Sequence, residues 1–216
     1  NNSKIISWYV TSPLIWGIHT AASSKIESEE DMEGCKYAIS RFGSGSHMMA
    51  LVDAANRGFT IKEDEWKVVD SLNGARKSLK INETDLFFWE KFTTKPFVDE
   101  GEFRRIGECP TPWPCFAIMV RDDVLVEHEN EIITLLEELQ QKAYDLKNYD
   151  QAVPLIAERY GLLEEDVAEW LSKTEWATST EIDVNILDQT QEVLMQVGKL
   201  EKKLPFVLLQ YELETD

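Results

Sequence analysis

The residues best suited to chemistry lie in one short segment, Ser40–His47, which reads SRFGSGSH. Gly43 and Gly45 allow a tight turn and a close approach of the backbone to a ligand. The hydroxyls of Ser44 and Ser46, together with the N–H groups at the start of a helix, suit a small anion or a polar group. An ordinary serine-capped helix start has the same pattern. Because neither GK[ST] nor GxGxxG is present, the segment disfavours binding of a nucleotide phosphate.

Catalytic and metal-binding patterns are absent from the sequence. There is no Ser-His-Asp arrangement and no HExxH motif. The three cysteines, Cys35, Cys109 and Cys115, include no CxxC pair and have no histidine at ligand spacing. Cys109 and Cys115 flank the turn CPTPWPC, where they form either a disulfide, in an oxidising compartment, or two thiols. We therefore predict no catalytic residue, no metal site and no cofactor.

The elements that must position the SRFGSGSH turn alternate between short strands and helices. The chain has 216 residues, 24.9 kDa, with 43% hydrophobic residues, which is enough for a buried core. The strand and helix patterns over the first half predict βαβ units. The predicted strands are 4–10, 16–22, 36–41, 66–70 and 86–89, and the predicted helices are 46–57 and 73–79.

The second half of the chain reads as one irregular segment and then mostly as helices. Residues 92–114 contain four prolines and two glycines and are expected to be irregular, followed by a strand at 115–121. Apolar residues then recur at helical spacing, which predicts helices from residue 127 onward, including 153–160, 164–171 and 185–203. The sequence therefore predicts a helical C-terminal third.

The charge balance bears on the class of partner. The chain has 22 basic and 40 acidic residues, a net charge of −18, which argues against nucleic acid and anionic membranes as partners. The acidic run Glu27–Asp31 is typical of a solvated surface and is assigned no function. The longest uncharged apolar-rich stretch, 5–22, is interrupted by Pro13, Gly17 and His19, so membrane insertion is not expected.

Several longer stretches carry a resemblance to a known family. They are DMEGCKYAISRFGSGSHMMALVDAANRG, DSLNGARKSL, TDLFFWEKF and RRIGECPTPWPCFAIMVRDDVLVEHENEIITLLEEL. The sequence resembles the substrate-binding proteins of nitrate, sulfonate and thiamine-precursor ABC transporters. The motifs PLIWGIH and SRFGSGSH are most similar to a subgroup that includes intracellular fungal proteins.

The resemblance implies an α/β fold of the type 2 periplasmic-binding-protein class, with two lobes joined by hinge strands that close on a small ligand. Residues 1–20 would form part of the first lobe and a hinge strand. Residues 21–118 would form the second lobe, and 119–216 the return hinge and helices packed on the first lobe. Since the family begins with roughly one further βαβαβ stretch, the first lobe is expected to be incomplete here.

The same resemblance implies a set of ligand-binding residues in the cleft. It comprises Trp16, His19, Arg41, Gly43, Ser44, Gly45, Ser46, His47, Trp89, Glu90 and Trp113. Each also has a plainer interpretation. The tryptophans can belong to the core, the histidines can be hydrogen-bonded structural residues, and Glu90 can pair with Lys91 or Lys95.

The function expected from the resemblance is binding of a small solute without catalysis. A planar or zwitterionic molecule, such as a thiamine-pyrimidine precursor or a related nitrogen or sulfur compound, fits the tryptophans better than a simple inorganic anion does. The alternative is a thiamine-pyrimidine biosynthesis enzyme on the same fold, which would depend on pyridoxal phosphate and a cysteine-rich motif that has no match here. A transporter permease would be a partner in the periplasm. The expected location is cytoplasmic for a fungal-type member and periplasmic or lipid-anchored for a bacterial one.

Overall fold

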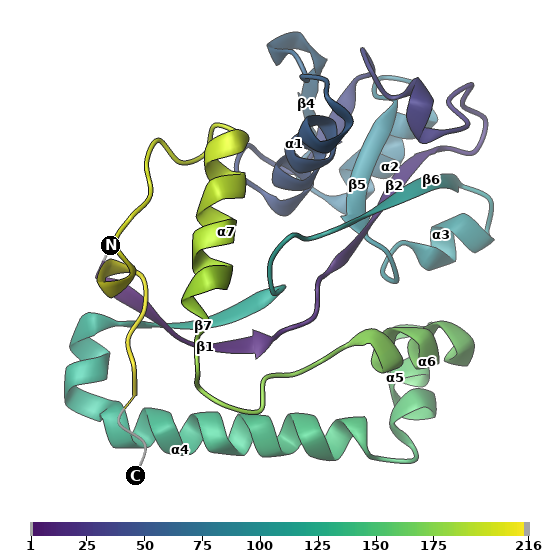
Figure 1. Ribbon diagram of the computed structural model, residues 1–216. Helices are drawn as coiled ribbons and strands as arrows, with labels where there is room; N and C mark the ends of the chain where they lie inside the picture. Colours follow the sequence, from purple (N-terminus) through teal and green to yellow (C-terminus); the bar gives the residue numbers. More distant parts are fainter. Residues whose placement is uncertain (1, 214–216) are drawn as a thin grey trace. The chain divides into compact units, whose positions relative to one another are not determined.

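The computed structural model describes residues 2–213 and separates into two compact units (Figure 1). One unit is Leu14–Thr111, and the other combines Asn1–Pro13 with Pro112–Asp216. Residue 1 and residues 214–216 of the predicted lobe ranges lie outside the described part of the chain. Each unit has its own sheet and helices, which confirms the prediction of a mixed α/β protein.

Unit 14–111 is built on a five-stranded mixed sheet. In sheet order the strands are β4 (Trp66–Val68), β3 (Tyr37–Ile39), β5 (Leu86–Glu90), β2 (Ile15–Ala21) and β6 (Phe103–Pro110). β3 is parallel to both β4 and β5, as the βαβ pattern predicts. β2 is antiparallel to β5 and to β6. The sheet therefore has a parallel half and an antiparallel half.

Two helices cover this sheet, and their ends follow from capping residues. In α1 (Gly45–Arg57) the Ser44 side chain accepts a hydrogen bond from the N–H of His47, and Gly58 ends the helix with a left-handed φ of 83°. α2 (Leu72–Lys80) begins in the same way, at Ser71. The apolar face of α2 packs with Ala38 and Phe87. Since strand side chains alternate, the neighbours of Phe87 in β5 face the opposite side, where α1 contacts β3 and β5.

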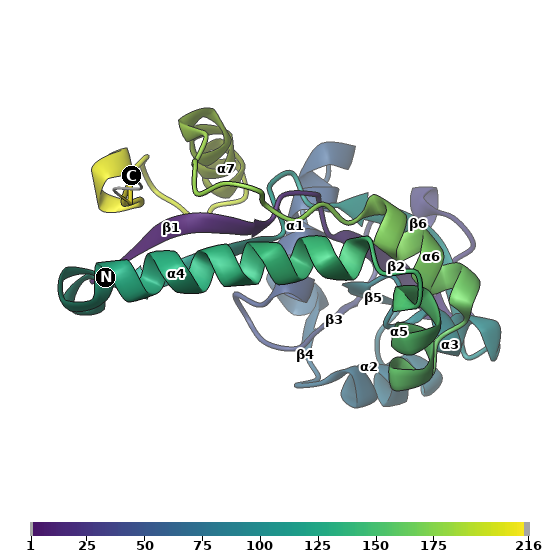
Figure 2. The same ribbon diagram turned by 90° about the horizontal axis from the view of Figure 1, so that it is seen from below.

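The described residues of the other unit form a two-stranded ribbon and four α-helices. β1 (Ser3–Val10) pairs antiparallel with β7 (Phe116–Arg121). The helices are α4 (Asp122–Lys147), α5 (Ala152–Tyr160), α6 (Glu164–Lys173) and α7 (Val184–Gln196). α4 runs along the ribbon in both views (Figures 1 and 2), where Ile6 packs with Leu125, Ile132 and Leu136.

Two predicted elements are wrong. The segment 92–114 is not irregular throughout, because it contains the short helix α3 (Lys95–Asp99) and the strand β6. The prolines do not prevent this, since β6 is an edge strand and Pro110 is its last residue. The helix predicted at 185–203 ends at Gln196, because Gly198 follows with a left-handed φ of 69°.

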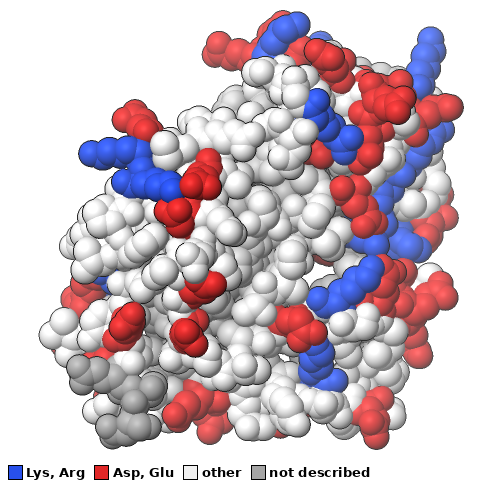
Figure 3. Space-filling model, in the orientation of Figure 1, with Lys and Arg blue, Asp and Glu red and all other residues white. Residues whose placement is uncertain are grey.

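Acidic and basic side chains lie interspersed on the face shown in Figure 3, with wide areas that carry neither. Many of the basic residues form ion pairs, such as Lys67 with Glu83 and Lys203 with Asp188, each 2.7 Å apart. Within residues 2–213, no helix combines the length and the apolar character needed to cross a membrane.

Candidate functional site

Several predicted site residues meet at one edge of the five-stranded sheet. β3 and β5 are parallel neighbours, so the turn after β3 and the last residue of β5, Glu90, lie at the same edge. β2 is antiparallel to β5 and begins at that edge, where Trp16 is opposite Glu90 in the register. In open α/β sheets, ligands bind outside the carboxyl ends of the parallel strands. This edge is therefore the candidate site.

The serine hydroxyls of the SRFGSGSH turn are used within the turn itself. Oγ of Ser44 donates to the carbonyl of Arg41 at 2.6 Å, and Oγ of Ser46 accepts from the N–H of Ser40 at 3.0 Å. Both serines are buried. The hydroxyls thus shape the turn, and Ser44 also takes the N–H of His47, so the N–H groups of Gly45 and Ser46 are the helix-start donors left for a ligand.

Trp16 forms a wall over the start of α1. Its indole lies so close to Gly45 that a Cβ at residue 45 would stand 2.6 Å from Cζ2 of the ring. Trp89 meets the same indole edge to face, with ring centroids 6.5 Å apart. Nε1 of Trp16 is buried and has no hydrogen-bond acceptor among the described residues. An indole N–H without an acceptor is costly, and a ligand oxygen or nitrogen would satisfy it.

His47 holds the turn in place. Its Nδ1 accepts a hydrogen bond from the N–H of Gly43 at 2.9 Å, which places the ring proton on Nε2. The ring is in edge contact with Phe42 and Trp66, at centroid distances of 5.2 and 4.8 Å. Sequence reasoning missed both aromatics. Phe42 is 60% exposed, and an aromatic residue inside a glycine-serine turn is the signal that would have found it.

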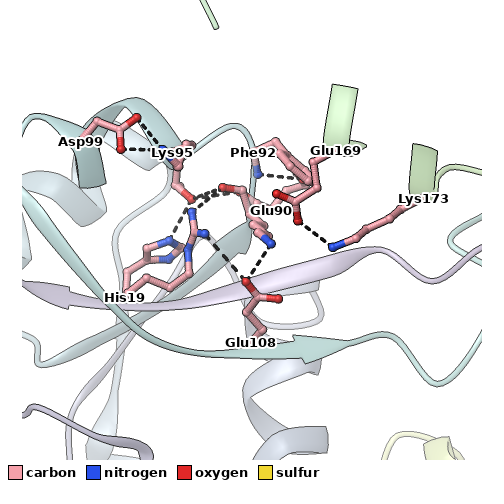
Figure 4. Close-up of polar contacts among 11 residues, drawn as sticks. His19, Glu90, Phe92, Lys95, Asp99, Glu108, Glu169 and Lys173 are labelled. Carbon is pink, nitrogen blue, oxygen red and sulfur yellow. Dashed lines mark hydrogen bonds and ion pairs between the residues drawn. The ribbon is translucent and has the colours of Figure 1, made fainter. Parts of the chain in front are cut away.

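His19, labelled in Figure 4, lies in the interior, and both of its ring nitrogens have partners. Nδ1 lies 3.3 Å from the carbonyl oxygen of Phe87, and Nε2 lies 2.9 Å from Oγ1 of Thr94. Burial, and secondly the positive charge of Arg105, lower the pKa of His19 from 6.5 to about 3. The imidazole is therefore neutral and occupies a structural position.

Glu90 binds the turn that follows β5 (Figure 4). Its two carboxylate oxygens accept the N–H groups of Phe92 and Thr93 at 3.0 and 2.7 Å, and the hydroxyl of Thr93 donates at 2.6 Å. The lysines considered as its partners pair elsewhere, Lys91 with Glu108 and Lys95 with Asp99. The carboxylate thus fixes the backbone beside Trp16.

The remaining predicted residues are placed as follows. Arg41 is exposed at the beginning of the turn, and Trp113 belongs to the other compact unit. The structure thus brings together Trp16, Trp89, Glu90, Arg41 and residues 43–47, and it separates His19, whose ring is in the interior. That these residues bind a ligand stays a prediction.

Cys109 lies in β6 and is a buried thiol, so the alternative in which it pairs with Cys115 is not observed. Burial, and secondly the charge of Asp53, raise its pKa to about 12. Asp53, also buried, forms a 2.7 Å ion pair with Arg57, which also binds Glu29. Within residues 2–213 no cluster of His, Cys, Asp and Glu has the arrangement of a metal site.

Comparison with known proteins agrees with this architecture. The family model of the Ca3427-like periplasmic binding proteins (PBP) matches residues 16–109, the segment that contains the candidate edge. None of the curated proteins matches the chain. The solved structure of the CA3427 gene product of Candida albicans is similar over the whole chain and 75% of its own length, with 24% identity and a TM-score of 0.86.

Two bacterial structures are also similar. The alkanesulfonate-binding protein SsuA of Xanthomonas axonopodis pv. citri, bound to MOPS, is 14% identical over 98% of this chain and 74% of its own, with a TM-score of 0.77. The aliphatic sulphonate-binding protein SsuA of Escherichia coli is 16% identical over 96% and 71%, with a TM-score of 0.63. The predicted fold class is therefore confirmed: the chain has the periplasmic-binding-protein fold, and its residues 16–109 match the Ca3427-like family of that fold.

Proposed function

We propose that this protein binds a small, planar and polar solute at the edge where β3 and β5 end, and that it does so without catalysis. The observation that carries the proposal is the position of Trp16. Its indole flanks the N-terminus of α1, and its Nε1 has no acceptor among the described residues. A flat wall and nearby hydrogen-bond donors together suit a ring that carries polar atoms.

The charges at this edge support a zwitterionic or weakly anionic ligand. The start of a helix favours negative charge, and Arg41 adds a cation at the turn. Nitrate or sulfate would need several N–H donors and would gain little from tryptophan faces. A thiamine-pyrimidine precursor has the ring and the polar substituents that this site would take, and a sulfonate with a ring is the nearest competitor.

Closure of two lobes on the ligand, with Trp113 as a further contact, is part of the proposal and rests on the family resemblance. A transporter permease as a partner is also part of the proposal. The structurally similar SsuA proteins are described as binding proteins, which supports a non-enzymatic role. The alternative, a thiamine-pyrimidine biosynthesis enzyme, gains no support from the thiols at 35 and 109, since burial raises both pKa values, to about 11 and 12.

The test is isothermal titration of the full chain with three probes: 4-amino-5-hydroxymethyl-2-methylpyrimidine, ethanesulfonate and nitrate. We expect the pyrimidine to bind most tightly. Trp16→Leu should weaken binding of the pyrimidine by about fivefold or more, since stacking contributes roughly 1–3 kcal/mol per ring. Trp170→Leu, in the other unit, is the matched control and should leave affinity unchanged. Tightest binding of nitrate, or an unaffected Trp16→Leu variant, would contradict the proposal.

A further inference from the structure

A second concave surface lies at the opposite edge of the same sheet. β2 begins beside Glu90 and runs antiparallel to β5, so residues 21–23 at its end lie away from the candidate site. These residues, one face of α2 and residues 101–103 surround a groove of about 550 Å³. That volume is within the range of small-molecule sites, roughly 300–1,000 Å³.

The groove has an apolar floor. Ala21, Leu79 and Phe103 all line it, and all three belong to one buried hydrophobic cluster. Each is less than one-tenth exposed. Because the sheet and α2 fix these side chains, the floor exists before any ligand arrives.

The rim of the groove is basic, in a chain whose net charge is −18. Arg76 and Lys77 are adjacent in α2 and Lys80 lies about one turn further on, and Glu102 is the one acidic residue of the lining. Glu102 is already neutralised, because its two oxygens accept from Nε and Nη2 of Arg76 at 2.7 and 2.6 Å. Arg76 is held further by the ring of Phe97, 4.2 Å from its guanidinium carbon.

Lys77 and Lys80 differ from most other lysines of the chain. Eight other lysines lie within 4.0 Å of an acidic oxygen. Among the described residues, neither Lys77 nor Lys80 has such a partner. The groove therefore combines an apolar floor with two lysines that have no acidic oxygen within 4.0 Å among the described residues, which is the chemistry that recognises an organic anion with an apolar body.

We propose that this groove is a second binding site, which takes a monoanionic carboxylate with an apolar chain or ring. The apolar part lies on Ala21, Leu79 and Phe103, and the carboxylate is held by Lys77 and Lys80. The site is independent of the solute site proposed above, because none of its residues belongs to that edge.

The experiment is a titration of the ¹⁵N-labelled full chain, followed by the shifts of individual amide signals in two-dimensional NMR spectra. Three probes separate the two components of the site: octanoate, acetate with the same charge, and octanol with a similar chain. We expect octanoate to shift the amide signals of Lys77, Lys80 and Gly101 saturably, at a concentration at least about tenfold lower than either of the others, since both components contribute. The octanoate affinity should fall as salt rises.

The double variant Lys77→Gln/Lys80→Gln should lower the affinity for octanoate by about tenfold, because it removes two exposed ion pairs of typical strength with the carboxylate. Lys62→Gln, in the same unit but outside the groove, is the matched control and should not change it. Three results would overturn the proposal: equal affinity in the double variant, shifts confined to residues 44–47, or equal binding of octanol. An unchanged octanoate affinity with a lowered melting temperature would show that the two lysines act only on the C-terminus of α2.

Discussion

The indole ring of Trp16 occupies the space that any side chain at residue 45 would need. Gly45 begins α1, and Trp16 is the second residue of β2, which lies two places away from β3 in the sheet, so this contact joins segments about 30 residues apart in sequence. A glycine is therefore needed at residue 45 to make room for the Trp16 ring, whether or not a ligand also approaches there.

Gly45→Ala should displace the Trp16 ring while leaving the fold intact. The clash is with the far end of a side chain, so the expected loss of stability is about 1 kcal/mol. The indole N–H signal of Trp16 should move, and affinity for the pyrimidine probe should fall at least about tenfold. Gly34→Asn is the control, because its φ of 80° is one that Asn tolerates and no atom lies near its Cβ position. An unmoved Trp16 signal in Gly45→Ala would refute the contact.

Gly74→Ala should destabilise unit 14–111 much more. A Cβ at residue 74 would stand 2.9 Å from the backbone carbonyl carbon of Val69 and closer still to its oxygen, and a backbone cannot rotate away. We expect a loss of about 3 kcal/mol in the free energy of unfolding, measured with urea. Asn73→Ala, exposed on the same helix, should change it by less than about 0.5 kcal/mol. Similar values for the two variants would show that Val69 yields easily.

His19 should make stability depend on pH in acid. Burial lowers its pKa in the folded protein to about 3, whereas the unfolded chain has the ordinary value of 6.5. Between these values the unfolded chain binds the extra proton, so stability falls as pH falls, by up to about 1.4 kcal/mol per pH unit from this group. The His19→Gln variant should lose this part of the slope. His128→Gln, exposed on α4, should retain it, and identical slopes in all three proteins would contradict the assignment.

Cys109 should resist alkylation in the folded protein. It is 4% exposed, and its raised pKa of about 12 leaves almost no thiolate at neutral pH. Mass spectrometry after treatment with iodoacetamide at pH 8 should find the Cys109 peptide unmodified in buffer and fully modified in guanidinium. Rapid modification under native conditions would mean that β6 opens readily.

Local patterns in the sequence predicted most elements of unit 14–111. Ser44 and Gly58 mark the ends of α1 because a serine cap and a left-handed glycine act within a few residues. The position of the SRFGSGSH turn between a strand and a helix is likewise predictable, because glycine and serine residues act on the backbone within a few residues. The convergence of Trp16 and Glu90 at that edge came from the family resemblance, and the strand register confirms their proximity.

What the sequence did not predict depends on partners distant along the chain. β6 becomes a strand because it pairs with β2, although prolines and glycines surround it. The roles of Glu90 and His19 depend on Thr93 and Thr94, whose hydroxyl contacts give no periodic signal. The groove beside α2 requires Arg76 to meet Glu102, 26 residues later, and no local rule connects the two.

The chain enters unit 14–111 at Leu14 and leaves it at Thr111, and these two residues are hydrogen-bonded to each other. The N–H of Thr111 donates to the carbonyl of Leu14 at 3.0 Å, and the N–H of Leu14 donates to Oγ1 of Thr111, also at 3.0 Å. In the other unit, the two segments that flank residues 14–111 are also joined, because the N–H of Cys115 donates to the carbonyl of Ser12 at 3.2 Å. Residues 14–111 thus have the form of an inserted cassette with its ends together. Because its ends are close together, such a segment can be moved to another protein or circularly permuted. A short linker could also replace it, because residues 13 and 112 of the other unit would need to span only a short distance.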